Sequence, residues 1–109
     1  MFRGAIVLVP FPFTDLSGNK VRPCVVLYEQ KGGDDCVVSF ISSIQKAKLE
    51  TFDLRIKATK LNGLKKDSVI KVNKIATLQK KIALGELGAV DPTLLLGIDT
   101  RLKKMLQLT

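Results

Sequence analysis

The sequence predicts a mainly β fold of the α+β class, in which a small, strongly bent antiparallel barrel is followed by one C-terminal helix. Short apolar runs with near-alternating β-branched residues recur up to about residue 90, which is typical of half-buried antiparallel strands. Beyond that point the apolar residues repeat at helical spacing instead. The chain has 109 residues and contains no repeat, linker or low-complexity tract, so we expect a single domain over residues 1–109.

Strand patterns occur in order along the chain, and turn residues separate them. A Gly- and Asp-rich turn at 30–35 predicts a hairpin between the second and third strands. Residues 61–64 resemble a short helical turn that ends at Gly63. The strands are expected at 5–11, 23–29, 36–43, 51–56, 68–74 and 81–87.

The C-terminal helix begins with a recognisable cap. Asp91 is a good N-cap acceptor, and Pro92 suits the first helical position. An apolar stripe then predicts packing against the sheet, or against a second copy of the chain in a homodimer. The stripe consists of Leu95, Ile98, Leu102, Met105 and Leu106.

Charge and composition limit the possible chemistry. The chain has 18 Lys and Arg against 10 Asp and Glu, a net charge of +8 that favours a polyanionic partner such as nucleic acid. A basic solvated surface would explain the same charge. The sequence contains no histidine, which removes His-based acid–base catalysis, His-ligated zinc and His-containing triads. We therefore expect neither a metal site nor a cofactor.

The cysteines and the N-terminus indicate a cytoplasmic protein. Cys24 and Cys36 lie within apolar runs, as buried reduced thiols do in an intracellular protein. The chain enters its first strand pattern directly, without a signal-peptide cleavage region. No apolar run approaches the length of a membrane span, so we expect no membrane contact.

Arg22 is the leading candidate for a functional cation. Pro23 follows it directly, and the residue before a proline is restricted to extended backbone. If the hairpin turn centres on residues 32 and 33, Arg22 lies opposite residue 43 or 44, and Cys24 opposite residue 41 or 42. Arg22 would then lie near Ser42 and Ser43, and a guanidinium beside hydroxyls is suited to a phosphodiester. A strand-end arginine beside turn serines is the structural alternative.

The loop between the first two strands offers possible ligand contacts. Phe13 could stack on a base, and Asp15 and Lys20 could contact a single-stranded ligand if the loop forms a flap. Asp15 is a candidate general base only if the loop folds inward. Alternatively, the loop's phenylalanines fill one end of the barrel.

Two further groups of polar residues could contribute to a binding site. Lys46 lies in a charged connection that could follow an RNA backbone, or could simply be exposed. In the fifth strand, alternation places Ile70 and Val72 on one face and Lys71 and Asn73 on the other. Lys71 and Asn73 could therefore reach a shared polar site, although a solvated strand face would show the same pattern.

These segments together resemble the MazF/PemK-like toxins of bacterial toxin–antitoxin systems. The resemblance covers nearly the whole chain, and the order and spacing of its blocks make it specific. It is carried by residues 4–7 with the 10–13 loop, by 20–23 with the apolar strand after it, by 41–49, and by 67–78.

The resemblance implies an SH3-like, partly open barrel that forms a homodimer, cleaves single-stranded RNA without a metal, and is neutralised by a cognate antitoxin. Arg22 occupies the position of the family's catalytic arginine. The catalytic hydroxyl role would fall to Ser42, where threonine is commoner. The chain departs from the pattern at Asn73, where some members have an acidic residue, at Lys71, where some have arginine, and at Ala76, which replaces a basic residue.

The expected reaction is attack of the RNA 2′-OH on phosphorus, giving a 2′,3′-cyclic phosphate and a 5′-OH. Arg22 would stabilise the developing charge, and no residue is identified as the general base. Two other functions are compatible with the sequence. One is a basic module that binds RNA or DNA without cutting it. The other is a gyrase-poisoning toxin of similar fold, acting through the 91–108 helix.

Overall fold

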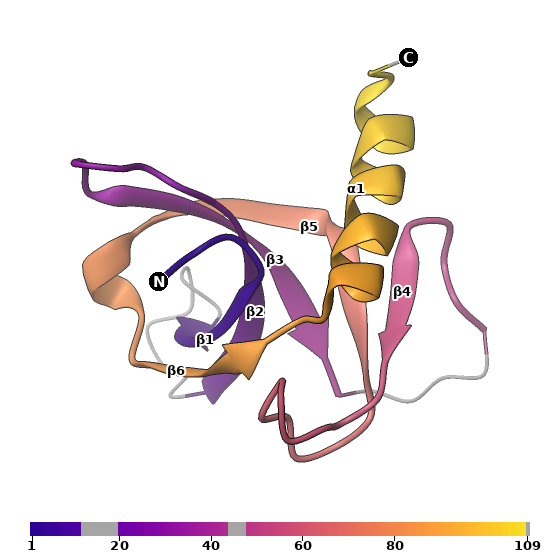
Figure 1. The fold of residues 1–109 in the computed structure, drawn as a ribbon, viewed down its shortest axis with the longest axis horizontal. Coiled ribbons are helices and arrows are strands. Elements are labelled where there is room, and N and C mark those ends of the chain that lie inside the picture. The colour runs from indigo at the N-terminus through magenta and orange to yellow at the C-terminus, as the bar shows by residue number, and fades with distance from the viewer. Residues whose placement is uncertain (12–19, 44–47, 109) are drawn as a thin grey trace.

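The computed structural model describes residues 1–11, 20–43 and 48–108. They form one antiparallel sheet with strand order β4-β5-β3-β2-β1-β6, followed by a single helix. The sheet curls into a half-barrel, and α1 stands beside β4 and β5 (Figure 1). The predicted fold class is confirmed. The elements are β1 (Ala5–Phe11), β2 (Lys20–Glu29), β3 (Asp35–Ser42), β4 (Asp53–Ile56), β5 (Ser68–Gln79), the 3-10 turn η1 (Lys80–Ile82), β6 (Gly85–Ala89) and α1 (Pro92–Leu106).

β2 is longer than predicted and begins at Lys20, so that Pro23 lies inside the strand opposite Leu8 of β1. The pairing of β2 with β3 starts only at Cys24. At Pro23 the strand therefore has a ladder partner on one side alone, and a proline is tolerated where no N–H is required.

The bounds of the later strands also differ from the prediction. β4 is confined to 53–56, and β5 continues to Gln79 instead of ending at 74. Residues 80–82 form η1, so β6 starts at Gly85 instead of 81. β5 was predicted too short because its apolar alternation is interrupted by an irregularity in the middle of the strand, described below.

Both faces of the sheet are buried, since alternate residues of one strand belong to different apolar clusters. In β1, Ile6 joins the cluster beneath the helix, whereas Val7 and Val9 belong to a second cluster within the barrel. In β2, Val25 belongs to the cluster beneath the helix and Cys24 to the second cluster. This period of two is that of a regular strand and shows that the barrel has its own interior, separate from the helix interface.

The helix stripe packs largely on the sheet, as predicted. Ile98 is fully buried in the cluster beneath α1, and Leu95 and Leu102 pack against that cluster. Leu106, at the end of the helix, is instead exposed. The Asp91 side chain accepts a hydrogen bond of 2.8 Å from the Leu94 N–H, which confirms the predicted cap.

Both cysteines are free and buried, as predicted. Burial raises the pKa of Cys24 to about 12, and the neighbouring Cys36 adds to this effect. The thiolate is the reactive form of cysteine, so Cys24 is not a nucleophile at neutral pH. No helix among the described residues is both long and apolar enough to cross a membrane.

Candidate nucleic-acid site

A cavity of about 350 Å³ lies where β2, β3 and β5 come together. Arg22 enters it from β2, Ser42 from the end of β3, and Lys71 from β5. The structure therefore places both predicted catalytic residues on one cavity wall together with one predicted substrate-binding lysine. The complete lining is Arg22, Phe40, Ile41, Ser42, Lys71, Lys74 and Ile75.

The hairpin register that brings Arg22 towards Ser42 differs from the predicted one. Cys24 pairs with Phe40, not with residue 41 or 42. The register shifts between Val26 and Tyr28, where Leu27 has no opposite residue on β3. A bulge of this kind inserts one residue on a single strand, which turn-centred counting cannot detect. Arg22 lies two residues before Cys24 on β2, and Ser42 lies two residues after Phe40 on β3, so both lie beyond the Cys24–Phe40 pair at the same end of the hairpin.

A second irregularity, in β5, shapes the other side of the cavity. Ser39 pairs with Ile75, but the next residue, Phe40, pairs with Lys71. Residues 72–74 therefore have no partners on β3. The buried Ser39 hydroxyl donates a hydrogen bond of 3.0 Å to the Val72 carbonyl, which satisfies one acceptor of the interrupted ladder. Such bulges redirect side chains, and here Lys74 reaches the cavity.

Lys71 is held by acidic neighbours. Its Nζ atom donates to Asp53 Oδ2 at 2.9 Å and lies 4.0 Å from Glu50 Oε2. The hydrogen bond to Asp53 raises the pKa of Lys71 above its ordinary 10.5, attraction to both carboxylates reinforces this, and burial opposes it. Because a raised lysine pKa favours the charged folded form, this contribution to stability is complete below the ordinary pKa and is lost as pH rises through the raised value. Among the residues that the structure describes, including those around Lys71, no three acidic or cysteine side chains gather as metal ligands would.

None of the other predicted site residues that the structure describes lines this cavity. Lys20 is exposed at the start of β2, and Ser43 is exposed directly after β3. Asn73, expected to share a site with Lys71, lines a different groove with residues 48–52. Lys74 was missed, because regular alternation gives no sign of the bulge that redirects it. Phe13, Asp15 and Lys46 lie outside the described residues.

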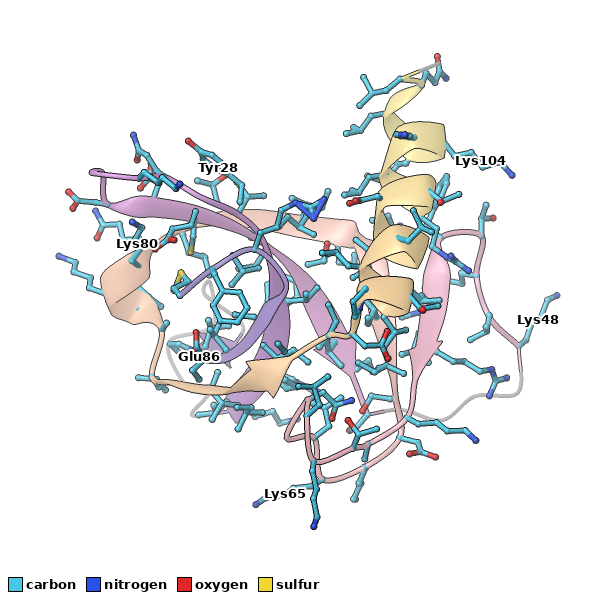
Figure 2. All side chains as sticks on the ribbon, viewed as in Figure 1. Tyr28, Lys48, Lys65, Lys80, Glu86 and Lys104 are labelled. Atoms are coloured by element: carbon cyan, nitrogen blue, oxygen red, sulfur yellow. The ribbon has the colours of Figure 1, made fainter. Side chains whose placement is uncertain are left out.

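The positive charge alone does not locate this site. Lys48, Lys65 and Lys104 extend outward from separate parts of the molecule (Figure 2), whereas the Lys80 ammonium pairs with Glu29 and donates to the Gln30 carbonyl. Lys48 precedes β4, Lys80 follows β5, and Lys104 lies near the C-terminal end of α1. The net charge of +8 is thus distributed, and it is the cavity that brings an arginine, a hydroxyl and two lysines together.

The sequence matches a family model described as "PemK-like, MazF-like toxin of type II toxin-antitoxin system" over residues 2–106. The chain belongs to this PemK/MazF toxin family. None of the curated proteins matches it.

Solved structures described as endoribonucleases or as MazF toxins share the whole fold at low sequence identity. An endoribonuclease from a mycobacterial species, in complex with its cognate antitoxin, has a TM-score of 0.80 at 17% identity and covers 100% of this chain and 97% of its own. The MazF of Deinococcus radiodurans has a TM-score of 0.77 at 17% identity, covering 98% and 96%. The Mycobacterium tuberculosis toxin MazF-mt6 has a TM-score of 0.74 at 14% identity, covering 94% and 96%.

Proposed function

We propose that this toxin is an endoribonuclease that cleaves single-stranded RNA without a metal ion. The observation that carries the proposal is the convergence of Arg22 and Ser42 in one cavity, beside Lys71 and Lys74. A phosphodiester is an anion with hydrogen-bond acceptors, and guanidinium, hydroxyl and ammonium groups are its natural ligands. The related structures described as endoribonucleases and MazF toxins support RNA as the substrate.

The cavity side chains suit a reaction in which RNA supplies its own nucleophile. The 2′-oxygen forms a bond to phosphorus and loses its proton, while the bond from phosphorus to the 5′-oxygen breaks and that oxygen gains a proton. The products are a 2′,3′-cyclic phosphate and a 5′-OH. Arg22 stabilises the negative charge that grows on the phosphorane oxygens, and its high pKa makes it a poor proton donor. Ser42 hydrogen-bonds a phosphate oxygen or orients the 2′-OH.

The lysines supply further positive charge around the phosphate. Lys71 is protonated at neutral pH, as lysines ordinarily are, and the hydrogen bond to Asp53 raises its pKa further. Lys74 lies on the same cavity wall. Asn73, in the neighbouring groove, offers hydrogen bonds to an adjacent nucleotide but cannot act as a base. Lys20 and Ser43 are further proposed RNA contacts, and so are Phe13, Asp15 and Lys46, which lie outside the described residues.

We further propose the partners and location that this function requires. The toxin acts on mRNA in the cytoplasm, as a homodimer, and a cognate antitoxin covers the RNA site. One mycobacterial relative was solved with its cognate antitoxin, which supports this pairing. The membrane plays no part in the proposed activity.

The test is cleavage of a long single-stranded RNA by the purified toxin in excess EDTA, with both ends of each cut mapped. We expect cuts at a limited set of sequences, 5′ ends that a kinase can label directly, and 3′ ends blocked as cyclic phosphate. RNA that is bound but left intact would identify a non-catalytic module instead. Cutting that stops in EDTA would contradict the metal-independent route.

A further inference from the structure

An acidic residue is buried directly opposite the cavity lysine. β4 and β5 pair antiparallel, and within that ladder Asp53 is the cross-strand partner of Lys71. The Asp53 side chain is 2% exposed, whereas that of Lys71 is 28% exposed. Asp53 Oδ2 accepts hydrogen bonds of 2.9 Å from both Lys71 Nζ and the Glu50 N–H. The carboxylate is thus enclosed, and the lysine it holds also lines the cavity of Arg22 and Ser42.

We propose that Asp53 is a positioning residue, which fixes the Lys71 ammonium beside the scissile phosphate so that Lys71 acts with Arg22 on the transition-state charge. This inference rests on the proposed ribonuclease function. It adds to that function a second fixed cation and the buried group that orients it.

Stability alone does not account for this pair. The pair stands at one end of the β4–β5 ladder, and the pair next to it, Leu54 opposite Ile70, is apolar. A buried ion pair is often no more stabilising than well-packed apolar residues, because both charges lose their hydration. In the described part of the chain, Asp53 Oδ1 is buried without any hydrogen-bond partner, which adds to the cost of the carboxylate.

The backbone around Asp53 is anchored on both sides. Arg101, on α1, donates from Nε to the Asp53 carbonyl at 3.0 Å. The Asp53 N–H donates to the Glu50 carbonyl at 3.1 Å. A lysine has a long flexible side chain, and a hydrogen bond to a fixed acceptor restricts where its charge lies. Such preorganisation lets a charge act in the transition state without being reoriented during the reaction.

Lys71 lines two neighbouring cavities. Besides the cavity lined by Arg22, it lines a second one of about 160 Å³. Ser42 borders both, whereas Asp53 borders only the smaller one. The Asp53–Lys71 pair therefore lies directly behind the site of the proposed reaction. The charged groups around the Lys71 ammonium are Asp53 and Glu50, with Arg22, Lys74 and Lys48 on the walls of the two cavities.

The deciding variant replaces both partners by apolar residues, Asp53→Val with Lys71→Leu. We expect this protein to melt at or above the wild-type temperature, because the ladder keeps an apolar pair and loses two partly dehydrated charges. Its kcat for RNA cleavage should fall by about 10²-fold, with a smaller change in KM, because the phosphorane carries more negative charge than the bound substrate. Lys71→Arg should retain more of the activity than Lys71→Leu.

A single isosteric change keeps the test decisive if the double variant does not fold. Asp53→Asn preserves volume and a hydrogen-bond acceptor but removes the carboxylate charge. We expect kcat to fall by about 10-fold, because the Lys71 charge is less firmly positioned. We also expect the high-pH limb of the kcat profile to move to lower pH, because the Asp53 hydrogen bond that raises the Lys71 pKa is weakened. The matched control is Asp99→Asn, which removes a carboxylate that pairs with Arg3 and lines neither cavity, and it should leave kcat unchanged.

The outcomes separate the positioning role from the function on which it rests. A wild-type protein that does not cut RNA would overturn the proposed function. A wild-type protein that cuts RNA, with a folded double variant of equal kcat, would overturn only the role of Asp53. Asp53→Asn with unchanged kcat and an unchanged pH profile would overturn it as well.

Discussion

Replacing Arg22 by alanine is expected to lower kcat/KM for RNA cleavage by about 10²–10³-fold, the usual cost of removing one group that stabilises transition-state charge. Arg22 is half-buried at the cavity, on a strand whose pairing with β1 continues on both sides of it. The substitution therefore removes a side chain from the cavity wall without interrupting the sheet. The measurement is the rate of cleavage of one defined RNA, together with circular dichroism and thermal melting.

Arg22→Lys is the matched variant for this prediction. It keeps a positive charge but loses the planar fork that binds two phosphate oxygens at once. Its activity should lie between those of the wild type and the alanine variant. A folded Arg22→Ala protein that cuts at the wild-type rate would contradict the assignment of Arg22.

Gly63→Ala is expected to lower the free energy of unfolding by about 3–5 kcal/mol. Gly63 has φ +70°, in the left-handed region, and an added Cβ would lie 2.2 Å from the Leu87 carbonyl oxygen of β6. That oxygen belongs to backbone and cannot move aside as a flexible side chain would. The Gly63 N–H also donates to the Thr59 carbonyl at 3.0 Å, which confirms the predicted turn ending at this glycine.

Gly32→Ala provides the matched control. Gly32 has φ +71°, nearly the same as Gly63, but an added Cβ would meet nothing within 4 Å. This substitution should cost only the backbone strain, about 1 kcal/mol. Denaturant unfolding of both variants would measure the difference, which isolates the collision with Leu87. Equal losses at the two glycines would show that the 59–64 turn does not pack on β6 as described.

The parts of the fold that the sequence predicted well are those in which local chemistry decides the structure. β1 and the start of α1 follow from β-branched alternation and from the Asp91–Pro92 cap. The same alternation correctly grouped Ile70 with Val72 in the core. Arg22 was identified because the following proline restricts its backbone.

The parts that the sequence did not predict depend on non-local pairing. The bulge at Leu27 moved the hairpin register, and the interruption at residues 72–74 brought Lys74 into the cavity. Neither leaves a pattern along the chain, because each is defined by residues of another strand. In the sequence, Asp53 is an ordinary polar residue near the start of a predicted strand. Its pairing with Lys71 depends on the β4–β5 ladder, which local sequence does not reveal.

The gyrase-poisoning alternative depended on an available C-terminal helix, and the structure limits that availability. Ile98 is fully buried, and Arg101 bonds to the backbone of β4. The inner face of α1 is therefore part of the fold and not a surface that a second protein could contact.

In the proposed reaction, the cavity lined by Arg22 and Ser42 aligns the RNA's own 2′-hydroxyl for attack. The most direct measurement uses an RNA of known cleavage site in which the nucleotide 5′ to the scissile phosphate carries a single 2′-deoxy substitution. The toxin is expected to bind this RNA with near-normal affinity and to leave that position uncut, while it continues to cut an unmodified site elsewhere in the same molecule. Cleavage at the deoxy position would show that another nucleophile carries the reaction, and would contradict the account.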